Sequence, residues 1–377
     1  MKTALFICNS YLQLFNAINL TMQSLKDTKV DVIITDHSVG SFAVTDRLRQ
    51  VSVFDMVFEV SDCDYSNYVG YTSAHSKACV KLMESMGSYF GKKRLIHGAA
   101  ALWNGDGSYD SLYIANYNRF SKGVFFRLLQ RNSKLKLYMF DEGWFTYTIN
   151  MLQQGKFDSM INRFFPCYAI AHQHLAQLWL YEPELLQASY GVSVCRIPPI
   201  TPQHHAVRKI INFVFDYENM VDTYDEPFLF FEESFFQDGI TNGDLDVVLQ
   251  ISKQVGKDNL LVKRHPRNRV NRFEAAGIKT NQVAGIPFEV ICMNMPDMVN
   301  KTFLSISSTA ALTPKLILNA HPKTILLYKA IDFPIRTLSS QFTEYIRRFK
   351  TLDESMQLYT PNSLEDLQTL IQSKSKA

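Results

Sequence analysis

The sequence has no apolar run long enough to span a membrane, and its cysteines form no recognisable metal motif. The first apolar run, residues 4–8, is broken by Asn9 and Ser10 and is too short for the core of a signal peptide. The six cysteines include no C-x-x-C pair, and several lie inside apolar segments, as reduced and buried thiols do. We therefore expect a cytoplasmic protein, which leaves peripheral contact with the inner face of a membrane open.

A large excess of one charge sign is also lacking. The 39 basic and 36 acidic residues give a formal net charge of +3, whereas nucleic-acid-binding proteins concentrate basic residues on one face. Nucleic acid is therefore not expected as a partner. The hydrophobic content of 46% and the charged content of 20% are those of a folded globular protein and exclude a disordered chain. The composition does not distinguish a monomer from a homodimer.

Short apolar segments alternate with segments that have helical spacing. Strands are expected at residues 3–8, 30–35 and 56–60 with helices between them, which is the pattern of a parallel sheet with right-handed crossovers. A second series of the same kind begins at residue 228. The further strands that we expect are residues 111–115, 136–140, 228–231, 259–264, 303–306 and 323–327. The further helices that we expect are residues 42–49, 73–90, 150–180, 245–255, 288–294, 310–319 and 363–373.

The chain of 377 residues is too long for one ordinary core. Residues 192–202 contain three prolines and are the expected crossing between two domains. We assign residues 1–200 to an amino-terminal Rossmann-like domain, residues 201–361 to a carboxyl-terminal one, and residues 362–377 to a closing helix and tail. Two doubly wound parallel-sheet α/β domains facing a central cleft resemble the GT-B architecture of glycosyltransferases, although a fold alone does not specify a function.

The strand expected at residues 259–264 ends in a cluster of basic residues. Lys263, Arg264 and His265 stand at its carboxyl end, and Pro266 stops the strand because proline cannot donate to a sheet ladder. Ligands of open α/β sheets lie outside the carboxyl ends of the strands. This cluster predicts a cationic phosphate site, with a solvated basic turn as the alternative.

Hydroxyl groups follow a later strand. Ser307, Ser308 and Thr309 stand between the strand at 303–306 and the helix at 310–319, whose first N–H groups have no helical partners. Hydroxyls at such a helix start can form a neutral anion cradle, with ordinary capping of the helix as the alternative.

A glutamate lies between these two strand ends in the sequence. Glu289 is near the start of the helix expected at 288–294. A carboxylate beside a nucleotide phosphate site can accept both hydroxyls of a ribose, as in dinucleotide-binding folds. The alternative is that Glu289 only complements the positive end of the helix dipole.

Two pairs of acidic residues end strands and are candidates for a general base. Asp141 and Glu142 form one pair, and Glu232 and Glu233 form the other. Adjacent residues on an extended chain point opposite ways, so one member of each pair can face a cleft. A carboxylate within hydrogen-bond reach of a substrate hydroxyl can remove its proton. The alternative for Asp141 and Glu142 is a solvated acidic turn, and Glu232 and Glu233 are rivals for the same role.

No convincing metal site emerges from the sequence. Asp244 and Asp246 form an Asp-x-Asp pattern that could hold a divalent ion, but they begin a helix and are explained more simply by capping. His172 and His174 are two residues apart on an expected helix and do not share a face.

These motifs resemble those of bacterial sialyltransferases. Asp141, Glu142 and Gly143 resemble the Asp/Glu-Asp/Glu-Gly motif, residues 263–266 resemble the His-Pro motif, and Ser307 with its neighbour resembles the Ser/Thr phosphate motif. The motif neighbourhoods are most similar to glycosyltransferase family 52, which contains lipooligosaccharide and capsule sialyltransferases. The stretch around Glu289 is also similar to family 80.

The resemblance implies a metal-independent, inverting transfer of sialic acid from CMP-sialic acid to a galactose-type acceptor of a bacterial surface glycan, without a cofactor. It implies that the first domain binds the acceptor and the second the nucleotide sugar. His265 would bind the CMP phosphate and assist its departure, and Asp141 or Glu142 would be the base, with Glu232 and Glu233 as rivals. The residues expected to bind the donor are Lys263, Arg264, Glu289, Ser307, Ser308 and Thr309.

Two alternatives to this function are weighed. The same fold could use another nucleotide sugar with a hexose as the transferred group. The chain could also be a non-catalytic glycan-binding module that keeps the cleft.

Overall fold

The structure is a computed structural model of the chain. It describes residues 1–36, 41–61, 88–105, 107–152, 167–236, 239, 243–282, 285–331 and 339–372. The chain divides into two compact units, Met1–Pro198 and Pro199–Ala377, and each is described by itself. The boundary predicted from the prolines falls after residue 200. Within the described residues, no helix is both long enough and apolar enough to cross a bilayer.

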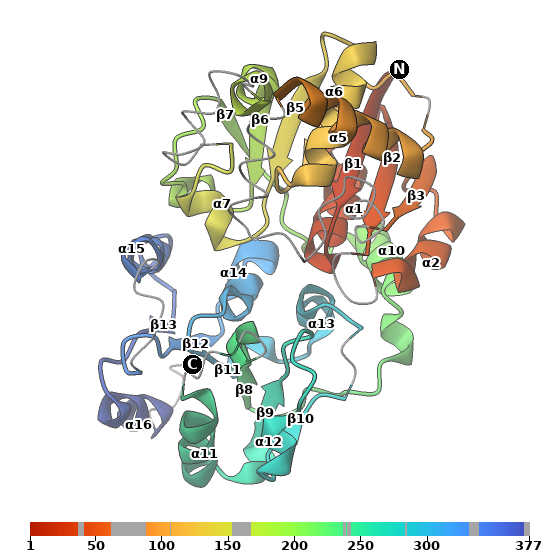
Figure 1. Cartoon of the computed structure of the whole chain (residues 1–377). Helices are drawn as coiled ribbons and strands as arrows, with labels where there is room; N and C mark the ends of the chain where they lie inside the picture. Colours follow the sequence, from red (N-terminus) through yellow and green to blue (C-terminus); the bar gives the residue numbers. More distant parts are fainter. Residues whose placement is uncertain are drawn as a thin grey trace. The chain divides into compact units, whose positions relative to one another are not determined.

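The first unit is built on a parallel sheet of seven strands in the order β3-β2-β1-β4-β5-β6-β7 (Figure 1). The strands are β1 (Lys2–Cys8), β2 (Thr28–Thr35), β3 (Met56–Val60), β4 (Ser111–Ile114), β5 (Lys136–Phe140), β6 (Leu175–Leu180) and β7 (Ser193–Arg196). The helices and 3₁₀ turns are α1 (Tyr11–Ser24), η1 (Ser41–Val44), α2 (Thr45–Gln50), α5 (Ser88–Leu102), α6 (Arg119–Arg131), α7 (Trp144–Thr148), α9 (Cys167–His174) and η2 (Pro183–Leu185). Strand β1 is buried from Ala4 to Cys8, which is the continuous apolar run of a parallel strand covered on both faces.

The second unit is built on a parallel sheet of six strands in the order β10-β9-β8-β11-β12-β13 (Figure 1). The strands are β8 (Phe228–Phe231), β9 (Leu260–Lys263), β10 (Lys279–Thr280), β11 (Thr302–Ser305), β12 (Lys323–Leu326) and β13 (Leu358–Tyr359). The helices are α10 (His205–Val214), α11 (Asp244–Val255), α12 (Arg272–Ala275), α13 (Phe288–Asn294), α14 (Thr313–Leu318), α15 (Ser339–Lys350) and α16 (Leu364–Gln372), with 3₁₀ turns that include η4 (Ser234–Phe236) and η7 (Thr309–Leu312). Phe230, Leu304 and Ile325 of the central strands pack with Ile251 of α11 and Leu367 of α16 in one core.

Each sheet reverses its strand order once. In the first unit the chain moves outward from β1 to β3 and then returns to the other side of β1 with β4, so β1 and β4 are neighbours. In the second unit it moves from β8 to β10 and returns beside β8 with β11. Ligands of open α/β sheets bind at the carboxyl ends of the strands beside such a switch point. The fold therefore directs attention to the residues that follow β1 and β4, and those that follow β8 and β11.

Two expected elements near the end of the first unit are wrong. Residues 175–180, expected as helix, form β6, and residues 193–196, expected as part of a link, form β7. Strand β6 pairs with β5 on one side and β7 on the other, so sheet pairing overrides the weak local preference of this segment. Residues 153–166, from the same expected helix, lie outside the described residues.

The expected helices are otherwise adjusted at their ends. Of the helix expected at 73–90, residues 73–87 lie outside the described part, and residues 88–90 begin α5. The helix expected at 310–319 is a 3₁₀ turn, η7, followed by α14, which has a proline in its first turn, where the missing N–H costs nothing. Helices α6, α7, α10, α12 and α15 were not expected from the sequence.

A single truncation in the second core should be costly. Leu304 in β11 is fully buried in this core, so Leu304→Ala should reduce the free energy of unfolding by about 2–5 kcal/mol through lost burial and a residual cavity. Urea unfolding followed by circular dichroism measures this change. Val299→Ala, at a side chain that is 53% exposed, is the matched control and should change it by less than about 0.5 kcal/mol.

Candidate active site

The ends of three neighbouring strands in the second unit are joined by two adjacent glutamates. Strand β8 lies between β9 and β11, and Glu232 and Glu233 follow it directly. Glu232 Oε2 accepts a hydrogen bond from the backbone N–H of His265 at 3.0 Å. Glu233 Oε1 accepts from the N–H of Ser307 at 2.8 Å and from its hydroxyl at 2.5 Å. The basic end of β9 and the hydroxyl-bearing end of β11 therefore lie at one edge of the sheet, on either side of β8.

The imidazole of His265 has a defined tautomer in its neutral form. The backbone N–H of Arg267 donates to Nδ1 of His265 at 3.2 Å, so Nδ1 acts as an acceptor. The proton of a neutral imidazole then belongs on Nε2, as inferred from this contact. His265 is half-buried, whereas Pro266 and Arg267 are exposed. In this tautomer the hydrogen-bond donor of the ring is Nε2–H.

Lys263 and Glu289 influence each other electrostatically. Lys263 is the buried last residue of β9, and Glu289 lies in the first turn of α13. Burial lowers the pKa of Lys263, and the charge of Glu289 opposes this change. Burial likewise raises the pKa of Glu289, and Lys263 opposes it. Glu289 is therefore coupled to the basic strand end, which goes beyond simple matching of the helix dipole.

Arg264 is tied into its own loop. Its backbone N–H donates to Asn281 Oδ1 at 2.6 Å, and its guanidinium Nη2 donates to the carbonyl of Asn268 at 2.7 Å. Asn268 in turn donates from Nδ2 to the carbonyl of Glu233 at 2.8 Å. The side chain of Arg264 thus shapes the loop after β9, and its place in donor binding stays a prediction.

The three hydroxyl residues after β11 differ in their surroundings. Ser307 is bound by Glu233, as described above, and Ser308 accepts at Oγ from the N–H of Ala310 at 3.3 Å. Ser308 is therefore the cap of η7, which Thr309 begins. The backbone N–H of Ser308 donates to Ser305 Oγ at 3.0 Å. All three residues after β11 are partly exposed, so their hydroxyls border solvent at the edge of the sheet.

Arg272 binds two acidic residues, Asp244 and Glu232, near the end of β8. Its guanidinium donates to both carboxylate oxygens of Asp244, at 3.0 and 2.7 Å, and to Glu232 at 3.3 Å. Its planar group also lies 4.0 Å from the ring centre of Phe236. Asp244 is thus engaged in a bidentate ion pair, whereas Asp246 is exposed. Among the described residues, no three His, Cys, Asp or Glu side chains gather in a way that could hold a metal ion.

Glu233 is a buried acid whose two carboxylate oxygens differ in their surroundings. Burial raises its pKa to about 7, while the two hydrogen bonds from Ser307 oppose that rise. Within the described part of the chain, its second oxygen Oε2 is buried without a hydrogen-bond partner. Such an orphaned oxygen is costly for an ionised carboxylate. The group therefore changes its charge near neutral pH, at the centre of this edge.

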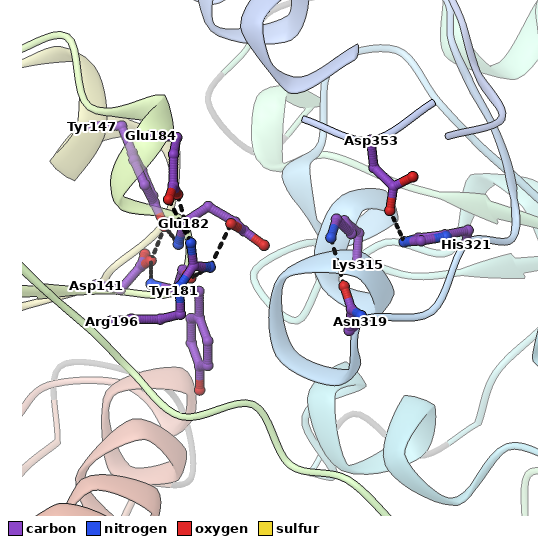
Figure 2. A network of polar contacts seen from close by, with 10 residues as sticks. All are labelled: Asp141, Tyr147, Tyr181, Glu182, Glu184, Arg196, Lys315, Asn319, His321 and Asp353. Atoms are coloured by element: carbon purple, nitrogen blue, oxygen red, sulfur yellow. Dashed lines mark hydrogen bonds and ion pairs between the residues drawn. The ribbon is translucent and has the colours of Figure 1, made fainter. Parts of the chain in front are cut away.

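In the first unit, Asp141 is directed into the protein interior. Figure 2 shows its carboxyl group between Tyr147, whose hydroxyl donates to Oδ2, and Tyr181, whose backbone N–H donates to Oδ2 at 3.3 Å. The N–H of Gly143 donates to Oδ1 at 2.7 Å, in a turn where Gly143 has a φ of 103° that favours glycine. Burial raises the pKa of Asp141 to about 6. Asp141 therefore anchors the turn from β5 to α7.

The surroundings of Asp141 are further fixed by an ion-pair cluster. Arg196, the last residue of β7, donates to the carbonyl of Tyr181 at 2.7 Å and pairs with Glu182 at 2.6 Å and Glu184 at 2.7 Å (Figure 2). The N–H of Glu182 also donates to the Tyr147 hydroxyl at 3.3 Å. These contacts join the ends of β5, β6 and β7 and keep Asp141 enclosed.

Glu142 points the other way, toward the switch point of the sheet. Gln13 Nε2 donates to its Oε1 at 2.5 Å. Asn116 Nδ2 donates to Oε1 at 3.0 Å and to Oε2 at 3.2 Å. Gln13 follows β1 and Asn116 follows β4, the two strands that flank the reversal. Glu142 is partly exposed, so it can meet a substrate at this edge.

The comparison with protein families decides the affiliation of the chain. Residues 4–328 match the sequence model of the alpha-2,8-polysialyltransferase family (POLYST). The chain belongs to this family. The prediction of a sialyltransferase is therefore confirmed at the level of the family, while the narrower likeness to families 52 and 80 stays a prediction. No curated protein matches this polysialyltransferase-family chain.

Solved structures with a similar fold are GT-B glycosyltransferases, which confirms the predicted architecture. The UDP complex of UGT89C1 from Arabidopsis thaliana aligns with a TM-score of 0.51 and 13% identity over 98% of this chain and 89% of that one. CalG4, the calicheamicin glycosyltransferase, aligns with a TM-score of 0.51 and 10% identity over 99% of this chain and 90% of that one. At this identity the likeness concerns the fold alone.

Several residues of the two edges were missed in the sequence analysis. Gln13, Asn116, Asn268 and Arg272 carry no motif of their own, and each acts through a hydrogen bond to a carboxylate or to a carbonyl at a strand end. The available signal is that Asn116 closely follows an expected strand. Its importance depends on β4 being the neighbour of β1, which is known only once the strand order is known.

The raised pKa of Glu233 predicts a pH-dependent stability of this polysialyltransferase-family protein. Its pKa is 4.5 without burial and about 7 in the folded chain, so between these values the folded state holds a proton that the unfolded state has lost. The stabilisation is complete below about pH 4.5 and is lost as the pH rises through about 7. A pKa shift of this size corresponds to about 3 kcal/mol. Glu233→Gln, which stays neutral, should remove this part of the pH dependence in urea unfolding between pH 4.5 and 8.

The matched control is Glu218→Gln, at an exposed glutamate of the same unit. This variant should follow the pH dependence of the wild type. Parallel curves for the wild type and Glu233→Gln would show that Glu233 does not titrate in this range.

Proposed function

We propose that this protein transfers sialic acid from CMP-sialic acid to a sugar hydroxyl of a surface glycan, such as a capsule or lipooligosaccharide, with inversion and without a metal ion. One observation carries the proposal: the His265 end of β9 and the Ser307 end of β11 lie on either side of β8, at the switch point of the sheet. This is where an α/β sheet binds a nucleotide. Membership in a sialyltransferase family supports the choice of the transferred group.

The donor chemistry fits these groups. When the bond between the anomeric carbon and the phosphate oxygen breaks, CMP leaves with growing negative charge on its phosphate. His265 would donate a hydrogen bond from Nε2 to a phosphate oxygen and so stabilise the charge of the departing group. The Lys263 charge and the hydroxyls of Ser307 and Ser308 would stabilise the same oxygens. Glu289, coupled to Lys263, would accept the ribose hydroxyls.

The acceptor hydroxyl attacks the anomeric carbon from the opposite face and must lose its proton. Among the first-unit carboxylates, Glu142 is the favoured base because it is partly exposed, whereas Asp141 is buried and holds a turn. Glu232 and Glu233 are disfavoured because both are buried, and His265, Arg272 and Ser307 bind three of their four carboxylate oxygens. Attack from the opposite face with departure of CMP gives inversion.

The description of the family bears on the acceptor. An alpha-2,8-polysialyltransferase joins sialic acid to sialic acid, so a terminal sialic acid is the acceptor that we favour over the galactose-type acceptor suggested by the motifs. Transfer assays with an oligosialic acid and with a galactose-terminated glycan separate the two. Product from the galactose-terminated glycan alone would reverse this preference.

Removal of the imidazole tests the role assigned to the end of β9. His265→Ala should lower kcat for sialyl transfer by about 10²- to 10³-fold, the usual cost of removing one hydrogen-bond donor to a charge that develops in the transition state. Circular dichroism should show that the fold is retained. Arg269→Ala, at an exposed residue of the same loop, is the matched control and should keep its activity. Full transfer activity in His265→Ala would end the proposal.

Nucleotide binding tests the donor. A ligand that binds only the folded state raises the melting temperature, so CMP should raise it, whereas UDP and GDP should not. Ser307→Ala should reduce the shift with CMP because one phosphate-binding hydroxyl is lost. A shift with UDP and none with CMP would favour a nucleotide hexose as the donor.

A further inference from the structure

The amide groups around Glu142 have a fixed direction. The backbone N–H of Asn9 donates to Gln13 Oε1 at 2.7 Å, so the other end of this amide, Nε2, is the end that faces Glu142. The Thr35 hydroxyl donates to Asn9 Oδ1 at 2.9 Å, and Asn9 Nδ2 donates to Asn116 Oδ1 at 3.3 Å. Nδ2 of Asn116 is therefore also turned toward the carboxylate. Two chains of hydrogen bonds therefore end at Glu142, where Gln13 and Asn116 are the donors.

This convergence favours the ionised form of the carboxylate. Glu142 accepts three N–H···O contacts, of 2.5, 3.0 and 3.2 Å, from two uncharged amides. Hydrogen bonds to the charged form of a carboxyl group lower its pKa. The arrangement also fixes the direction of the carboxylate, since its partners come from the segments that follow β1 and β4.

Two neighbours of Glu142 in the described part of the chain are compatible with this role. Thr146 of α7 accepts the backbone N–H of Glu142 at 3.2 Å through its neutral hydroxyl. Asp141, the adjacent titratable residue that directly follows β5, turns into the interior toward Tyr147. Gln13 is fully buried. This buried amide donates a hydrogen bond to a partly exposed carboxylate, and the contact fixes the position of that carboxylate.

We propose that Gln13 and Asn116 are positioning residues that keep Glu142 ionised and aimed at the acceptor hydroxyl. The inference rests on the proposed sialyl transfer, in which Glu142 takes the proton of the attacking hydroxyl. The ligand at this edge is then a hydroxyl-bearing glycan, and the proton moves from its oxygen to the carboxylate as the bond to the anomeric carbon forms.

The pH profile of transfer tests this role. In Gln13→Met and Asn116→Leu, side chains of similar size that cannot donate, the acid limb of the kcat/KM profile for the acceptor should move to higher pH by about one unit, because the carboxylate loses donors. Asn116→Asp, which keeps the shape of the side chain, places a second carboxylate against Glu142 and should move the limb further in the same direction. A purely structural role would lower the melting temperature and leave the limb in place.

Tyr147→Phe is the matched control, since it removes the hydroxyl that donates to Asp141. It should lower stability without moving the acid limb. A limb that moves in Tyr147→Phe but not in the Gln13 and Asn116 variants would identify Asp141 as the base and overturn the inference.

The inference can fail while the proposed function stands. Wild-type transfer from CMP-sialic acid with an acid limb that is the same in Gln13→Met, Asn116→Leu and Asn116→Asp would overturn only the positioning role. A wild-type protein that transfers no sialic acid from CMP-sialic acid would overturn both.

Discussion

The hydrogen bonds of Glu232 and Glu233 hold the candidate donor site together. They connect the end of β8 to His265 on one neighbouring strand and to Ser307 on the other. Without these bonds the backbone N–H groups of the two loops would lack their partners at the edge of a buried sheet, which is costly. The carboxylates also occupy the kind of donors that an incoming phosphate needs. The second unit thus keeps its anion-binding groups ordered by means of its own acids.

In the first unit, two adjacent acidic residues have different surroundings and different roles. Asp141 and Glu142 are neighbours at the end of β5, and the alternation of an extended chain sends one inward and the other toward the switch point. The inward residue meets Tyr147 and backbone N–H groups, and its burial raises its pKa. The outward residue meets Gln13 and Asn116 at a partly exposed edge. A two-residue motif can therefore combine a turn anchor with a reactive carboxylate.

The groups at the carboxyl ends of the strands differ in charge between the two sheets. Around β8 of the second unit, buried Lys263, Arg272 and the imidazole of His265 lie among acids, and burial raises the pKa of Glu232, Glu233 and Glu289. This suits a site that must receive a charged phosphate. Glu142 accepts from two neutral amides, and such donors suit a site that receives an uncharged hydroxyl. The difference follows from which residue types end the strands of each sheet.

The sequence by itself determined the two parallel α/β sheets and the residues at their strand ends, because an apolar run cut by Pro266 or followed by Ser307 is a local signal. It failed at residues 175–180, where pairing with β5 and β7 prevails over local preference. It also did not distinguish the roles of Asp141 and Glu142, and it did not identify Gln13 or Asn116. Only the tertiary structure shows the roles of these residues, because the strand order places the segments that follow β1, β4 and β5 side by side. No local sequence pattern contains that order.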